Sequence, residues 1–238
     1  MSRLDFNALI VSNHRLHAES LRDTMFFFHA LGIQTMILTV RYHRERHTIT
    51  DFSERMRKLK ADIRKIRPRG MKLIVCPEVS LTEGIADDPA LSRLTANRSE
   101  YLFVNLPLFH CDDWMDTDLN RILFQKHCRP IFTGFESNMK TYSSEQLERL
   151  IHSHSFIGCF DVNYLTSLSA HEPLTRMIRD GIAVLPCISH ELSDYAGVIA
   201  GFDALKDSLG NQRYVELCRT IQRCSHGVIA RIAKTAGS

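Results

Sequence analysis

Two short apolar runs, Thr35-Met36-Ile37-Leu38-Thr39-Val40 and Lys72-Leu73-Ile74-Val75-Cys76, stand on either side of a charged segment. Runs of this length and composition predict buried β-strands. In the charged segment, apolar residues recur at the spacing of one helical stripe: Phe52, Met56, Leu59, Ile63 and Ile66. The order strand, helix, strand is that of a βα unit in a parallel sheet.

The same pattern repeats along the chain. Further β-type runs are Phe6–Val11, Tyr101–Leu106, Pro130–Thr133, Phe156–Phe160 and Ile182–Cys187, so that successive strands start 26 to 37 residues apart and the gaps carry helical patterns. Seven consecutive βα units favour a closed barrel over an open doubly wound sheet. We predict an α/β protein with a seven-stranded (βα)7 TIM-like barrel, a single domain over residues 1–238 whose end is helical from about residue 197.

Two helix boundaries are marked by their residues. Gly32 follows the stripe of Leu21, Met25 and Phe28 at a position typical of a C-terminal cap. Ser143 and Gln146 have the spacing of a capping box before the next apolar stripe. A further helical pattern is expected over Thr166–Asp180.

The composition is that of an ordinary globular protein, because 44% of its 238 residues are hydrophobic and 24% are charged. No apolar run approaches the length of a membrane span, and the first residues show no secretory signal. We therefore expect a cytoplasmic protein. The seven cysteines are scattered without a CxxC pair, which predicts reduced core residues.

Positive charge is concentrated between Arg41 and Lys72, where twelve basic residues face four acidic ones, although the whole chain carries only +3. Such asymmetry indicates an anionic partner, either nucleic acid or a phosphorylated or acidic protein segment. The alternative is a solvated outer face of the helix.

Several catalytic motifs are missing. The sequence contains no GxGxxG, no P-loop, no GxSxG elbow, no Cys-x5-Arg phosphatase cradle and no HExxH. His43 and His47 are four residues apart, a spacing that can bind a metal on a helix, but the neighbouring Arg44 and Arg46 favour a surface loop.

In a barrel enzyme the chemistry lies at the carboxyl ends of the strands. The polar residues predicted there are Asn13, His14, Arg41, Tyr42, His43, Glu78, Asn105, Glu136, Asp161, Asn163 and His190. A metallohydrolase needs several histidines and carboxylates converging on its ions. Glu78, Glu136, Asp161 and His190 could assemble one such site; the alternative for these loop carboxylates is capping or solvation.

Several segments follow one another in a characteristic order and spacing: Glu19–Leu21, Leu31–Thr39, Leu73–Val79, Tyr101–Pro107, Arg129–Thr133 and the C-terminal Asp203–Leu217. In this order they resemble the bacterial capsule-type tyrosine phosphatases of the PHP (polymerase and histidinol phosphatase) superfamily. The resemblance implies a distorted seven-stranded barrel of the PHP type, manganese-dependent phosphatase chemistry and a role in capsule or exopolysaccharide biosynthesis.

At the family's catalytic positions the sequence departs from the pattern. The opening His-x-His falls near Asn7–Leu9, the Thr-Pro-His ending becomes Thr39-Val40-Arg41, and His-Pro-Glu-Arg keeps only Glu136. Among the implied metal positions only Glu78 and His190 remain, and two ligands cannot hold a multinuclear cluster. We therefore expect no cofactor. Arg41 is a candidate anion-binding residue, with a salt bridge to Glu78 or another carboxylate as the alternative.

Three hypotheses follow. The leading one is a degenerate PHP-type barrel with a binding or regulatory role, in which no residue is catalytic. The second is an active manganese-dependent phosphoesterase with a site rebuilt from Glu78, Glu136, Asp161 and His190, joined by His14 or His43. The third is a nucleic-acid-binding barrel that uses the basic segment; the absence of aromatic residues interleaved with its cations disfavours base stacking.

Overall fold

The computed structural model describes residues 8–13, 18–108, 113–153, 156–165, 176–177, 180, 182–188 and 195–234. Its parallel strands follow one another in sequence order and close into a barrel by the pairing of β1 with β7. The strands are β1 (Ala8–Asn13), β2 (Thr35–Tyr42), β3 (Lys72–Ser80), β4 (Tyr101–Asn105), β5 (Arg129–Thr133), β6 (Ile157–Asp161) and β7 (Ala183–Ile188). The predicted seven-stranded α/β barrel is confirmed.

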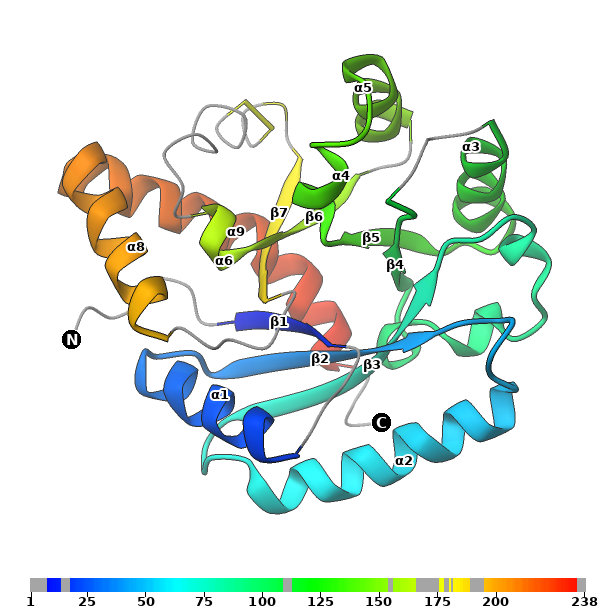
Figure 1. Cartoon of the computed structure of the whole chain (residues 1–238), viewed down its shortest axis with the longest axis horizontal. Coiled ribbons are helices and arrows are strands. Elements are labelled where there is room, and N and C mark those ends of the chain that lie inside the picture. Colours follow the sequence, from blue (N-terminus) through cyan, green and yellow to red (C-terminus); the bar gives the residue numbers. More distant parts are fainter. Residues whose placement is uncertain are drawn as a thin grey trace.

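Helices surround the strands on the outside of the barrel (Figure 1). They are α1 (Ala18–Ala30), α2 (Ile49–Ile66), α3 (Asp113–Asn120) with the π-helical turn η4 (Arg121–Gln125), α4 (Phe135–Asn138), α5 (Ser144–Ser153), α6 (Val162–Leu165), α8 (Tyr195–Leu209) and α9 (Asn211–Lys234). No helix in the described ranges is long and apolar enough to cross a membrane. Of the predicted helix over Thr166–Asp180, most lies outside the described residues.

Both predicted helix boundaries are present. Gly32 has a positive φ of 102° and lies two residues after the last residue of α1. Before α5, the Ser143 N–H donates to Gln146 Oε1 at 2.8 Å and the Gln146 N–H donates to Ser143 Oγ at 3.2 Å. This is the reciprocal pair of a capping box.

The connection between β3 and β4 differs from the prediction. In place of a helix it contains three 3₁₀ turns, η1 (Ile85–Asp87), η2 (Leu91–Arg93) and η3 (Ala96–Arg98). Gly84 enters the segment with φ of 75°, and Asn97 and Arg98 within η3 also have positive φ. These backbone angles are incompatible with a continuous α-helix.

Strands β2, β3 and β6 run beyond their predicted ends, and this moves site residues from loops into the sheet. Arg41 and Tyr42 belong to β2, and Glu78 belongs to β3, because the parallel ladder continues through the pairs Arg41 with Glu78 and Tyr42 with Val79. Asp161 likewise is the last residue of β6. Arg41 and Glu78 can remain in the ladder because their side chains pair with each other.

Buried side chains form two clusters separated by the barrel wall. Alternate strand residues, including Ile10, Ile37, Ile74, Phe103 and Leu185, point into the barrel and pack in one cluster with Val228, Ile229 and Ile232 of α9. The intervening strand residues pack outward against the surrounding helices. Cys76, Cys128, Cys159 and Cys187 are free and buried, which confirms the prediction of reduced core cysteines for these four, and Cys218 is also buried.

Candidate functional site

Glu78 is held by donors on both of its carboxylate oxygens. Its side chain is 1% exposed, and the Arg41 guanidinium, itself 18% exposed, donates from Nη2 at 2.7 Å and from Nε at 3.0 Å to Oε1. The Thr39 hydroxyl donates to Oε2 at 2.5 Å. Arg41 therefore makes the salt bridge that sequence reasoning left open, and anion binding by Arg41 stays a prediction.

This arrangement follows from strand geometry. Residues two apart on a strand point to the same face, so Thr39 and Arg41 project on the same side of β2. The register places Arg41 opposite Glu78 on β3. Buried charge is tolerated when it is paired and hydrogen-bonded, as Glu78 is.

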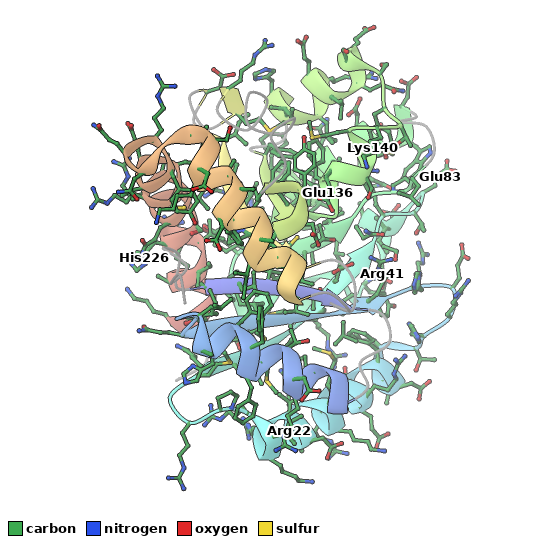
Figure 2. The ribbon with its side chains drawn as sticks, turned by 60° about the vertical axis from the view of Figure 1, so that its left-hand side comes forward. Arg22, Arg41, Glu83, Glu136, Lys140 and His226 are labelled. Atoms are coloured by element: carbon green, nitrogen blue, oxygen red, sulfur yellow. The ribbon has the colours of Figure 1, made fainter. Side chains whose placement is uncertain are left out.

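Glu136 and Asp161 form a second acidic group at the carboxyl ends of β5 and β6. Gly134, with φ of 66°, turns the chain from β5 into α4, which carries Glu136 back over the strand ends. The backbone N–H of Asp161 donates to Glu136 Oε2 at 3.4 Å, and both side chains are buried. Figure 2 labels Arg41 on β2 and Glu136 on α4.

Burial raises the pKa of the Glu136 carboxyl to about 6, and the nearby Asp161 charge adds to this effect. A carboxyl with such a pKa exchanges its proton near neutral pH, as a general acid or base must. Structural carboxyls are shifted by the same physics, so the pKa marks a candidate and assigns no role.

Two buried thiols lie within the electrostatic reach of these carboxylates. Burial raises the pKa of the Cys159 thiol, and the charges of Glu78 and Glu136 raise it further. Burial also raises the pKa of the Cys187 thiol, with contributions from Cys159, Glu136 and Asp161. Raised pKa values keep both thiols protonated and make them poor nucleophiles.

His43 and His47 lie in a loop, as the surface-loop interpretation predicted. The His43 backbone N–H donates to His47 Nδ1 at 3.2 Å, and His43 Nδ1 is 3.1 Å from Ser80 Oγ. His47 Nε2 is 3.0 Å from Arg55 Nη1. Burial, assisted by neighbouring arginines, lowers the pKa of each imidazole. The two rings thus engage separate partners.

The other predicted site residues are placed as follows. Asn105 ends β4, half-buried and in register with Ser80 of β3 and Thr133 of β5. His14 and His190 lie outside the described residues, as do the side chains of Asn13 and Asn163.

The donors that the structure describes at these strand ends do not fit a multinuclear metal cluster. Within the described ranges, no three His, Cys, Asp or Glu side chains are grouped so that they could hold an ion. Glu78, the described residue at an implied metal position, already faces a fixed guanidinium. A metal there would have to displace Arg41 and would lie next to its charge.

Sequence reasoning missed Thr39 as the second donor to Glu78. Its signal is the alternation of the strand, because Thr39 and Arg41 share a face. The hydrogen bond between Ser80 and His43 was missed because Ser80 was expected beyond the end of its strand.

Comparison with known proteins finds similar proteins through structure alone. No protein-family model matches the chain, and no curated protein matches its sequence. A crystal structure from the metal-dependent tyrosine phosphatases YwqE of Bacillus subtilis and CpsB of Streptococcus pneumoniae matches with a TM-score of 0.58 and 15% identity, covering 86% of this chain and 87% of that one.

The histidinol phosphate phosphatase of Lactococcus lactis subsp. lactis Il1403, solved with zinc, L-histidinol and phosphate, matches with a TM-score of 0.52 and 8% identity. The match covers 94% of that chain and 86% of this one. At these identities the likeness concerns the fold, so the chain has the barrel fold of these phosphatases, and the resemblance seen in its sequence is confirmed at that level.

Proposed function

We propose that this protein is a phosphatase-like barrel that acts by binding or regulation and does not hydrolyse phosphate esters. One observation carries the proposal: Glu78 is bound on both oxygens by Arg41 and Thr39. A metallophosphatase needs such a carboxylate free to ligate its ion. Here a guanidinium supplies the positive charge instead.

Arg41 gives the strand ends a chemistry different from that of a metal centre. Its planar fork is permanently charged and only partly exposed, and its remaining N–H groups are of the kind that bind carboxylates and phosphates. A role in capsule or exopolysaccharide biosynthesis stays a prediction from the sequence resemblance.

The rival function is a metal-dependent phosphoesterase with a rebuilt site, and the proximity of Glu136 and Asp161 favours it. The two carboxyl residues are linked by the Asp161 N–H, and burial holds the Glu136 pKa near 6. A metal bound between them would require further ligands, for which the sequence offers His190.

The test is elemental analysis of the purified protein, run beside hydrolysis of p-nitrophenyl phosphate and a phosphotyrosine peptide with added manganese. We expect no stoichiometric manganese, iron or zinc and no turnover above a buffer control. Stoichiometric metal with turnover would overturn the proposal. Loss of that turnover in Glu136→Gln and Asp161→Asn, but not in the surface variant Glu83→Gln, would establish the rebuilt site.

A further inference from the structure

A basic groove runs along the outer wall of the barrel, away from the strand ends discussed above. Its main cavity, about 500 Å³, lies between α2 and the 3₁₀ turns η2 and η3. A second cavity of about 430 Å³ continues it and shares Lys60, Arg64, Val75 and Asn97 with the first. We define the groove by its basic lining residues: Arg57, Lys60, Arg64, Arg67, Lys72, Arg93 and Arg98.

The charge of this groove has one sign. No Asp or Glu lines either cavity, although seven Lys and Arg side chains do. All seven are exposed. Like charges gathered in a concave surface focus a positive potential, which attracts an anion and costs the protein self-repulsion when none is bound.

Most of these cations also lack local neutralisation. Among the residues that the structure describes, Lys60, Arg64, Arg93 and Arg98 have no ion-pair partner, and Arg57 meets only the exposed Glu54 at 3.3 Å. Some cations outside the groove do have acidic partners: Arg149 with Asp116, Arg231 with Glu100, Arg121 with Asp87, Lys65 with Asp62. Other described cations outside it, such as Lys58 and Arg69, have none, so the groove is distinguished by bringing four unpaired cations together on one concave surface.

The spacing of the cations forms a regular row. Arg57, Lys60 and Arg64 are three and four residues apart, which places them along one face of α2, and Arg67 follows at the C-cap of the helix. Arg93 and Arg98 stand on the opposite wall. Asn97, whose side chain donates to the Ile232 carbonyl at 2.7 Å, anchors the η3 turn that presents Arg98. A linear anion lying in the groove would meet cations on both sides.

The floor of the groove decides the class of the anion. Its apolar lining residues that are at least partly exposed are Ile49, Ala61, Leu73 and Pro77. The only aromatic side chain lining either cavity is Phe52, which is 1% exposed and therefore offers no ring face. Single-stranded nucleic acids are bound by stacking bases on exposed aromatic rings. An acidic polypeptide in which apolar residues are interspersed with Asp or Glu matches a cationic rim over a partly apolar floor.

We propose that the basic groove binds an acidic segment of a partner protein, with carboxylates facing Lys60, Arg64 and Arg98 and apolar side chains against the floor. The inference goes beyond the proposed function and does not rest on it. A phosphorylated segment would use the same chemistry, since phosphate and carboxylate are both bound by guanidinium groups.

The test measures fluorescence anisotropy with three labelled probes of equal length: a Glu/Leu peptide, its Gln/Leu counterpart and oligo-dT. The groove variant combines Lys60→Ala, Arg64→Ala and Arg98→Ala. The matched control combines Lys58→Ala, Lys65→Ala and Arg69→Ala, which removes the same charge from exposed residues of the same region that line neither cavity. Circular dichroism checks that both variants are folded.

We expect the wild type to bind the Glu/Leu peptide and not the Gln/Leu peptide. The groove variant should weaken that binding about tenfold or more, since each lost contact at an exposed site weakens it a few-fold, and the control about twofold or less. Equal weakening by the two variants, or no binding of the Glu/Leu peptide, would overturn the proposal. Tighter binding of oligo-dT that is lost in the groove variant would replace it with a nucleic-acid site.

Discussion

Arg41 of β2 and Glu78 of β3 occupy opposite positions in a parallel ladder, and the guanidinium donates two N–H groups to a single carboxylate oxygen. Because Glu78 is 1% exposed, its charge depends on this partner and on the Thr39 hydroxyl. The pair therefore fixes the electrostatics of the strand ends and also contributes to folding. Its contribution to folding can be tested separately.

Replacing Arg41 by Met should lower the free energy of unfolding by about 3 kcal/mol, because removing one partner leaves an uncompensated buried charge. Arg57→Met, which removes an exposed partner of Glu54, should cost about 0.5 kcal/mol or less. Urea unfolding at pH 7 measures both values.

The double variant Arg41→Met/Glu78→Gln separates charge from packing. Gln retains an acceptor for the Thr39 hydroxyl and carries no charge, so most of the lost stability should return. If the double variant is as unstable as Arg41→Met alone, the pairing of charges does not explain the cost.

Gly158 lies in β6 among aromatic rings and has no room for a side chain. A Cβ there would come within 2.6 Å of Phe160 and 2.7 Å of Phe156. Phe135 packs against both of these rings, with centroid distances of 5.8 Å and 4.5 Å. Gly158→Ala should therefore destabilise the protein by about 1–3 kcal/mol, because the rings must move out of a packed core.

At Gly227, replacement of glycine by alanine should have the opposite effect on stability. It lies within α9, and a Cβ there would have nothing within 4 Å. Gly227→Ala should raise stability by about 0.5–1 kcal/mol, since alanine favours the helix. Thermal unfolding compares the two variants, and a stabilising Gly158→Ala would contradict the packing argument.

The barrel could be predicted because its signals are local. Strand runs such as Thr35–Val40 and the capping box at Ser143 each depend on a few neighbouring residues. The 3₁₀ turns between β3 and β4 were missed because the left-handed backbone of Asn97 and Arg98 has no clear residue signature. Those turns also form one wall of the basic groove, so its cavity could not be predicted from the charge pattern alone.

The candidate site was predicted less completely because it depends on register. Periodicity shows which residues are buried, and it does not show which strand residue lies opposite which. Arg41 and Glu78 were both candidate site residues. Whether Arg41 pairs with Glu78 or binds an external anion could be decided for the salt bridge only from the strand register, which places the two residues opposite each other. The proximity of Glu136 to Asp161 similarly depends on the turn at Gly134.

Thr48 begins α2, the helix that carries one row of the basic groove. The Asp51 N–H donates to Thr48 Oγ1 at 3.1 Å, and the Thr48 hydroxyl donates to Asp51 Oδ2 at 2.7 Å. Thr48→Ala should therefore lower the free energy of unfolding by about 1 kcal/mol. Ser53→Ala, which removes only a back-bond to the Ile49 carbonyl, should be close to neutral. Equal costs at the two positions in urea unfolding would contradict the capping role.

Glu136 should make stability depend on pH in the direction opposite to that of an ordinary ion-paired carboxylate. Burial raises its folded-state pKa to about 6 from 4.5, and the Asp161 charge adds to the increase. Between these values the folded state holds more protons than the unfolded state, so stability falls as pH rises through this window. Above pH 6 the ionised carboxylate costs the folded state about 2 kcal/mol.

Glu136→Gln removes that cost and keeps an acceptor for the Asp161 N–H. The variant should therefore match the wild type at pH 4 and exceed its stability by about 2 kcal/mol at pH 7. Urea unfolding across this range, with the exposed Glu83→Gln as control, measures the difference. A gain that is the same at both pH values would mean that Glu136 has the same pKa in the folded protein as in the unfolded chain. Glu136 would then not be a candidate for proton transfer near neutral pH.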